Sequence, residues 1–207
     1  MAYFNRVMEA AFTIAVAGLL WLLAGVPLVT LGPSTAALYS VMEAWGEDGP
    51  PPVWSTFWSG FRTHFRQAMA VGLLASAAAG LLLIDLMYGL RADGAPMRAA
   101  VMVAAILGVF AVGGTLMFVF PVMVCHPGPW RLVVRNSALF AAAYPLSTLA
   151  GLLLVAAASF VVGVVPMLLP VAAGFVGWAV MRLDQRAFAR LLARQEAQRA
   201  AQSTTTT

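Results

Sequence analysis

Asp85 is the residue whose position most strongly suggests chemistry, because it is the one acid well inside a long apolar run. It lies about five residues, or roughly 7–8 Å, inside the end of the predicted span 67–90. A charge at that depth requires a partner, a proton or water. One hypothesis is an outward-opening polar pocket that binds a ligand or a proton. We favour the other, an ion pair at the membrane surface involving Arg91 or the neighbouring Arg6 and Glu9.

The signatures of conventional enzymes are missing from this sequence. It has no HExxH motif, no glycine-rich phosphate loop, no Ser/His/Asp set in a plausible context and no pair of facing intramembrane acids. His64 and His126 are the only histidines. Cys125 and His126 together offer two ligands, whereas a metal site needs three or four. The sequence therefore predicts a protein that is not an enzyme, with no catalytic residues, cofactor or metal.

The composition indicates a membrane protein. Hydrophobic residues make up 62% of the 207 residues and charged residues 10%, against about 45–50% and about 25% in soluble domains. A helix needs about 20 apolar residues to cross the bilayer. Five such runs predict an all-α, polytopic helix bundle in a single membrane domain (1–207), with spans at about 8–31, 67–90, 97–124, 137–162 and 166–182.

The boundary between the last two predicted spans rests only on helix-breaking residues. No charged residue separates them, and only Gly163, Pro166 and Pro170 interrupt the apolar run. A single helix cannot cross the membrane with about 45 apolar residues, so we expect a tight turn there.

Arginine placement predicts the orientation. The chain has twelve arginines and no lysine. With a cytoplasmic C-terminus, only Arg6, Arg91 and Arg98 lie outside, and the inside holds Arg62, Arg66, Arg131, Arg135, Arg182, Arg186, Arg190, Arg194 and Arg199. This positive-inside bias predicts a bacterial inner-membrane protein with its N-terminus outside. Arginines scattered at span ends do not form a nucleic-acid surface, so no nucleic-acid partner is expected.

The predicted cytoplasmic loop 32–66 contains two helices. The first begins at Gly32-Pro33-Ser34-Thr35, where proline suits a first turn and hydroxyl side chains can cap free amides. Such a helix start could also hold an anion, although a simple cap is favoured. The second is amphipathic and has aromatic residues on one face, at Trp54, Phe57, Trp58, Phe61 and Phe65. It could lie at the lipid headgroups or pack beneath the bundle.

The chain ends in a predicted basic helix, and small residues mark predicted helix contacts. The tail 183–207 continues an arginine repeat that starts at Arg182, which suits a solvated helix end, anionic lipid or an acidic partner. Small residues let membrane helices approach closely. We expect such contacts, mainly within one chain, at Gly72, Ser76, Gly80, Ser147, Gly151, Gly174 and Gly177.

Several segments resemble the YesL-type family of small bacterial membrane proteins, a domain of unknown function. The most specific is Pro27-Leu28-Val29-Thr30-Leu31-Gly32-Pro33, within a longer match from Leu20 to Thr35 and Tyr39. The segment from Phe61 to Phe65 and Arg66 also agrees, as do Phe118 to Pro121, Arg135-Asn136-Ser137-Ala138 and Tyr144 to Leu149. The chain departs from the family at Gly18, where an Asn is common.

The resemblance implies an accessory component of a carbohydrate ABC import system. The permease or ATPase would then be the partner, docked on loop 32–66 and the basic tail. The motif residues that could serve docking are Pro27, Thr30, Gly32, Pro33, Thr35, Tyr39, Phe61, Phe65, Pro121, Arg135 and Asn136. Two alternatives stay open, a stand-alone small transporter or channel with a path past Asp85, and a membrane-bound sensor or regulator.

Overall fold

The computed structural model describes residues 2–45, 49–91, 94–125 and 128–182, and side chains from residue 8 onward. The described part is all-α, as predicted, and contains no strand. Its helices are α1 (Ala2–Gly25), η1 (Leu28–Thr30), α2 (Leu31–Glu43), α3 (Val53–Arg91), α4 (Ala95–Cys125), α5 (Trp130–Ala143), α6 (Pro145–Val164) and η2 (Pro166–Leu168). The 3-10 turn η2 opens a further apolar helix, Pro166–Arg182.

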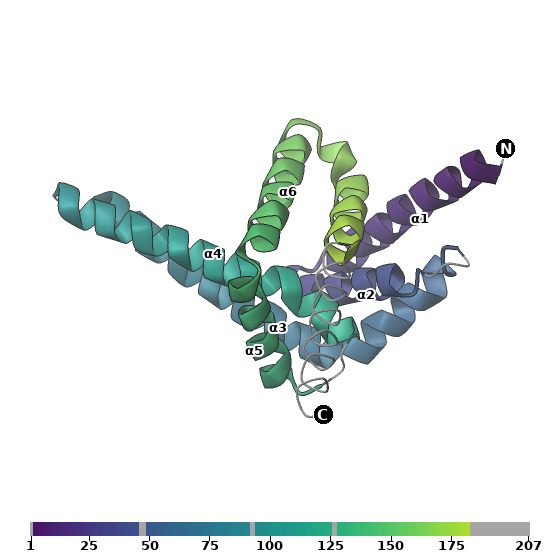
Figure 1. Cartoon of the computed structure of the whole chain (residues 1–207), viewed down its shortest axis with the longest axis horizontal. Helices are drawn as coiled ribbons and strands as arrows, with labels where there is room; N and C mark the ends of the chain where they lie inside the picture. Colours follow the sequence, from purple (N-terminus) through teal and green to yellow (C-terminus); the bar gives the residue numbers. More distant parts are fainter. Residues whose placement is uncertain (1, 46–48, 92–93, 126–127, 183–207) are drawn as a thin grey trace, which may run out of the picture.

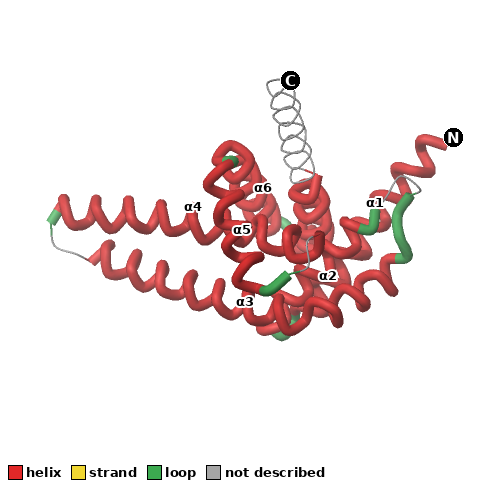
Figure 2. Tube along the Cα trace, turned by 60° about the horizontal axis from the view of Figure 1, so that its bottom comes forward, coloured by secondary structure: helices red, strands yellow, loops and turns green. Residues whose placement is uncertain are grey.

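Three helical arms spread from a common base (Figure 1). One arm is α1, the second pairs the end of α3 with the start of α4, and the third is the hairpin of α6 with the helix Pro166–Arg182. The base contains α2, α5 and the first part of α3, and the same arrangement is visible after rotation (Figure 2). The start of α1, the α3–α4 turn and the α6 turn therefore lie at the free ends of the arms.

The core of the base is built around α2. Ten of its 13 residues are buried. Gly32 of α2 lies against the backbone of Ala68 and Gly72 in α3. Ser40, nearer the end of α2, lies against Gly60, nearer the start of α3. Without a Cβ at these glycines the two antiparallel helices approach closely, which is how helices gain contact in an apolar environment.

Four helices are long and apolar enough to cross a membrane. They are Met8–Gly25, Val53–Arg91, Ala95–Cys125 and Pro145–Val164, and Pro166–Arg182 is an apolar but shorter helix. The protein is thus an all-α bundle with membrane-spanning helices. The 39 residues of α3 extend about 58 Å, well beyond the roughly 30 Å hydrocarbon layer, so α3 also contributes its first part to the base.

Two predicted boundaries in the N-terminal half differ from the structure. α1 ends at Gly25 instead of residue 31, because Pro27 disfavours helical backbone at the residue before it. Both helices predicted in segment 32–66 are present, as α2 and the start of α3. The aromatic helix is continuous with the second span in α3, since no proline interrupts residues 53–91 and helices propagate readily once formed.

The predicted fourth span, 137–162, is divided in two. α5 ends at Ala143 and α6 begins at Pro145, with Tyr144 at φ −123° and ψ 63° between them. Proline lacks an amide hydrogen and clashes with a helical residue before it, so Pro145 starts a new helix. The turn predicted near Gly163 and Pro166 is present. The predicted basic tail 183–207 lies outside the described residues.

Most of the glycines predicted at helix contacts lie there. Gly174 packs on the backbone of Ile14 in α1, Gly151 on Met117 and Gly177 on Leu38. Gly80 is the exception, because a Cβ built on it has no neighbour within 4 Å. It lies on the α3–α4 arm, where the two helices are exposed on most of their surface.

Candidate functional site

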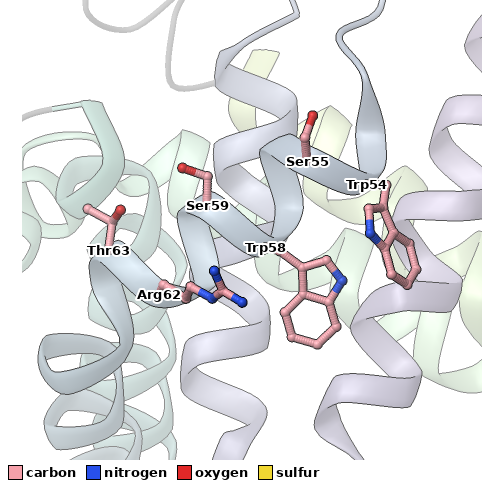
Figure 3. A pocket seen from close by; sticks show the side chains of 6 residues that line it. All are labelled: Trp54, Ser55, Trp58, Ser59, Arg62 and Thr63. Carbon is pink, nitrogen blue, oxygen red and sulfur yellow. The ribbon is translucent and has the colours of Figure 1, made fainter.

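The first turns of α3 carry two stripes of surface side chains (Figure 3), of which Trp58 is half-buried and the other five are exposed. Trp54, Trp58 and Arg62 recur every fourth residue and point to one side, because residues four apart share a helix face. Ser55, Ser59 and Thr63 follow one position later and point to another side. We call these six residues the base surface.

The aromatic stripe is ordered by ring contacts along the helix. The Trp54 and Trp58 ring centroids are 5.9 Å apart, and those of Trp58 and Phe61 are 5.4 Å apart, in edge-to-face geometry. Phe57 on the same helix is fully buried, whereas Trp54 is 65% exposed. The helix is therefore anchored on protein through Phe57, while Trp54 is directed away from the bundle.

Two hollows flank the hydroxyl stripe. One, of about 670 Å³, is lined by the base surface alone. The other, of about 430 Å³, shares Ser55, Ser59 and Thr63 and adds Glu43 from α2 and His64. Desolvation lowers the pKa of His64, which precedes the predicted span, so its imidazole is neutral at pH 7. The second hollow therefore carries the Glu43 carboxylate without an opposing histidine charge.

The start of α3 is fixed by Pro52. Its carbonyl accepts hydrogen bonds from the Ser55 hydroxyl at 3.1 Å, the Thr56 hydroxyl at 2.9 Å and the Thr56 amide at 3.1 Å. Proline residues before this point restrict the backbone further. The base surface is thus held at a defined helix start.

The Pro-x-x-Thr-x-Gly-Pro motif forms the joint between α1 and α2. The Thr30 hydroxyl donates to the carbonyls of Ala24 and Pro27, and the Ser34 hydroxyl donates to the Thr30 carbonyl at 2.7 Å. Pro33 is buried in the same joint. The motif therefore holds two helices together, and its place in the core limits its access to a partner.

The predicted capping of free amides by this motif is wrong in detail. Thr30, the N-cap residue of α2, makes no side-chain capping bond. The hydroxyls of Ser34 and Thr35 bond to carbonyls four residues earlier, because α2 starts at Leu31 and places them inside the helix. Amides at the entry bond to backbone as well, Thr30 to Pro27 and Leu31 to Leu28.

The remaining motif residues are distributed over the molecule. Tyr39 is buried in α2, Pro121 is buried in α4, and Phe61 and Phe65 are half-buried. On α5, Arg135 is exposed and Asn136 is half-buried. Of the predicted docking residues, those with exposed side chains are Pro27 and Arg135, so the exposed part of segment 32–66 is chiefly the base surface.

Asp85 lies on the exposed surface of the α3–α4 arm. Within the described part of the chain it makes no hydrogen bond or ion pair, so the ion pair with Arg91 is not seen there. The side chain of Arg6 is outside the described set. The same residues hold no group of three or more His, Cys, Asp or Glu suited to a metal ion.

Sequence reasoning missed the hydroxyl stripe and several bonds between elements. Gln67 donates to the Gly128 carbonyl at 3.1 Å, which ties α3 to the segment before α5. The Trp21 ring nitrogen donates to the Thr35 hydroxyl at 3.1 Å. The spacing of Ser55, Ser59 and Thr63, four residues apart, could have revealed the stripe. No sequence pattern could have revealed the two hydrogen bonds, since each joins residues far apart in sequence.

Known proteins match most of the chain. The family described as "Protein of unknown function, DUF624" matches residues 14–86. The chain is 32% identical to the uncharacterized protein YteU of Bacillus subtilis over 80% of its length and 75% of YteU. It is 30% identical to the uncharacterized protein YesL of the same organism over 95% of each. No solved structure matches. The chain belongs to the DUF624 family, together with these YesL-like proteins.

Proposed function

We propose that the protein is a non-enzymatic accessory subunit of a carbohydrate ABC import system, and that it docks on the permease or ATPase through the base surface. The observation that carries this proposal is the surface stripe of exposed Trp54, half-buried Trp58 and exposed Arg62 on a helix anchored by buried Phe57. The importer is inferred as the partner from the family resemblance. The base surface is the proposed docking site.

The composition of the stripe supports a protein contact. Tryptophan and arginine are the residues most enriched where binding energy concentrates at interfaces. Rings held in edge contact lose little conformational entropy when they bind. Two further arginines are held over tryptophan rings. Arg131 of α5 lies over Trp130 at 5.4 Å, and Arg182, at the end of the last helix, lies over Trp178 at 5.7 Å.

The proposed orientation places the base in the cytoplasm of a bacterial cell. Among the described arginines, Arg91 and Arg98 lie at the tip of the α3–α4 arm, and the base and its neighbouring helix ends hold Arg62, Arg66, Arg131, Arg135 and Arg182. Positive charge concentrates on the cytoplasmic side of membrane proteins. The base surface would then face an importer's ATPase or the cytoplasmic loops of its permease.

Co-purification tests the proposal. The full-length protein would be tagged in its native host, extracted in mild detergent and analysed by mass spectrometry for near-stoichiometric partners. We expect importer subunits with the unaltered protein and their loss from the variant Trp54→Ala/Trp58→Ala. The control is Tyr88→Ala, since Tyr88 is an equally exposed aromatic on the α3–α4 arm. Absence of importer subunits even after crosslinking would refute the proposal.

A further inference from the structure

A second cavity lies away from the base surface, between four helices. It has a volume of about 450 Å³ and is bounded by Trp21 of α1, by α2, by α6 and by the helix Pro166–Arg182. Figure 1 shows α6 and the last helix as a hairpin standing above α2. Since α6 is a membrane-spanning helix, the cavity lies where the surrounding medium is hydrocarbon.

The polar groups around the cavity bond to the protein itself. The Trp21 ring nitrogen donates to Thr35, and the Thr35 hydroxyl donates to the Leu31 carbonyl at 2.7 Å. The Ser159 hydroxyl donates to the Val155 carbonyl at 2.8 Å. Tyr39 is a further polar residue of the lining and is buried, and the rest of the lining is aliphatic or small. Buried water requires two to four polar partners, and a sugar requires more, so this lining suits an apolar occupant.

Small side chains keep the cavity open. Ala158 faces it from α6, and Ala172, Ala173 and Gly177 face it from the last helix. Gly177 already approaches Leu38, because a Cβ on it would lie 3.0 Å from the Leu38 side chain. Larger residues at these positions would fill the space between the helices of the hairpin.

The volume distinguishes between apolar occupants. A helix is about 10–12 Å across with a 5.4 Å pitch, so one turn alone occupies roughly 400–600 Å³. A cavity of about 450 Å³ therefore holds at most about one helical turn, which is too little to seat a helix of a partner or of a second copy. A single flexible hydrocarbon chain would fit, and it would restore dispersion contacts that an empty cavity loses.

We propose that this cavity binds one acyl chain of a bilayer phospholipid. The chain would lie between α6 and the helix Pro166–Arg182, above the Trp21–Thr35 hydrogen bond. It would fill the space left by the small residues and so stabilise the hairpin on α1 and α2. This proposal does not depend on the importer or on the base surface.

Neighbouring alanines on α6 give a matched test. Ala158 lines the cavity, whereas Ala157 is exposed on another face of the same helix. Full-length protein and the variants Ala158→Phe and Ala157→Phe would be purified in mild detergent and examined by native mass spectrometry. We expect retained phospholipid on the unaltered protein and on Ala157→Phe, and its loss from Ala158→Phe. Equal retention by both variants, or detergent as the only occupant, would overturn the proposal.

A photoreactive lipid locates the binding site. The protein would be reconstituted in phosphatidylcholine vesicles containing a trace of phosphatidylcholine with a diazirine in mid-chain, illuminated and digested. We expect labelling of Ala172, Ala173 or Val176 that Ala158→Phe removes and Ala157→Phe keeps. Should Ala158→Phe unfold in a thermal melt, Ala173→Leu closes the opposite wall and takes its place. Labelling confined to outward residues such as Phe175 would contradict the proposal.

Discussion

At the scale of single residues, Gly18 permits a close crossing of two helices. Gly18 of α1 lies directly against the carbonyl of Pro170, and Gly174 lies in turn against the backbone of Ile14. The two helices therefore cross through paired glycines. An Asn at position 18, as the resemblance would suggest, could not fit this crossing without moving the last helix.

The crossing predicts a loss of stability on adding one methyl group. Gly18→Ala would force α1 away from Pro170, and overpacking of this kind costs about 1–3 kcal/mol. We expect a lower Tm in a detergent-based thermal melt. Gly80→Ala is the control and should leave Tm unchanged or raise it, because a Cβ there meets no atom within 4 Å. Equal behaviour of the two variants would rule out the crossing.

A substitution of Asp85 distinguishes the proposed accessory subunit from a stand-alone transporter. In an accessory subunit, Asp85→Asn should leave both importer co-purification and uptake of labelled sugar by whole cells unchanged, since Asp85 lies on the arm and away from the base surface. In a carrier with a path past this carboxyl group, uptake would fall while the partner stays bound. The unaltered protein and a deletion strain set the two limits of the assay.

At the scale of elements, the joint between α5 and α6 is held by one side chain. The Thr148 hydroxyl, which is fully buried, lies 3.0 Å from the carbonyls of both Ala141 and Tyr144. Pro145 has no amide hydrogen to donate to the Ala141 carbonyl, whereas the Tyr144 carbonyl also accepts the Thr148 amide at 3.0 Å. The hydroxyl thus links the end of one helix to the start of the next.

Removing this hydroxyl should weaken the joint. Thr148→Val keeps the shape but leaves the buried Ala141 carbonyl without a donor, which costs about 1–3 kcal/mol, so we expect a clear drop in Tm. Thr115→Val is the matched control, because the Thr115 hydroxyl bonds only to the Ala111 carbonyl within α4. A drop of the same size in both variants would show that the joint has no special role.

At the scale of the whole molecule, the three arms extend from the base in three different directions (Figure 1). Arg91 and Arg98 lie at an arm tip, whereas Arg62, Arg66 and Arg135 lie in the base. Because positive charge concentrates on the cytoplasmic side of membrane proteins, this distribution supports the proposal that the base faces the cytoplasm.

Thiol labelling checks the orientation. With Cys125 replaced by Ala, single cysteines would be introduced by Ser55→Cys in the base surface and Ala95→Cys at the arm tip, both exposed positions. A membrane-impermeant maleimide applied to intact cells should label Ala95→Cys, and Ser55→Cys only after the cells are lysed. The reverse pattern would place the base outside and refute cytoplasmic docking.

The sequence by itself determined the membrane class, the all-α fold and the family, and it marked several glycines that lie at helix contacts. Apolar runs of spanning length, glycine spacing and the Pro-x-x-Thr-x-Gly-Pro motif are local patterns, and local patterns can be read without a structure. The break between α5 and α6 at Tyr144-Pro145 could also have been predicted from the sequence, because a proline stands at the break. We expected one span there because the run of apolar residues hid the effect of Pro145.

Only the tertiary structure decided which residues are accessible. The motif residues Gly32 and Pro33 lie in the core, because α2 is enclosed by α1, α3 and α4. On α3, Phe57 is buried and Trp54 is exposed, because only one side of that helix packs on the bundle. The acyl-chain cavity likewise depends on four helices that are distant in sequence. Burial is a property of contacts between such segments, and hydrophobic spacing within one segment does not specify its neighbours.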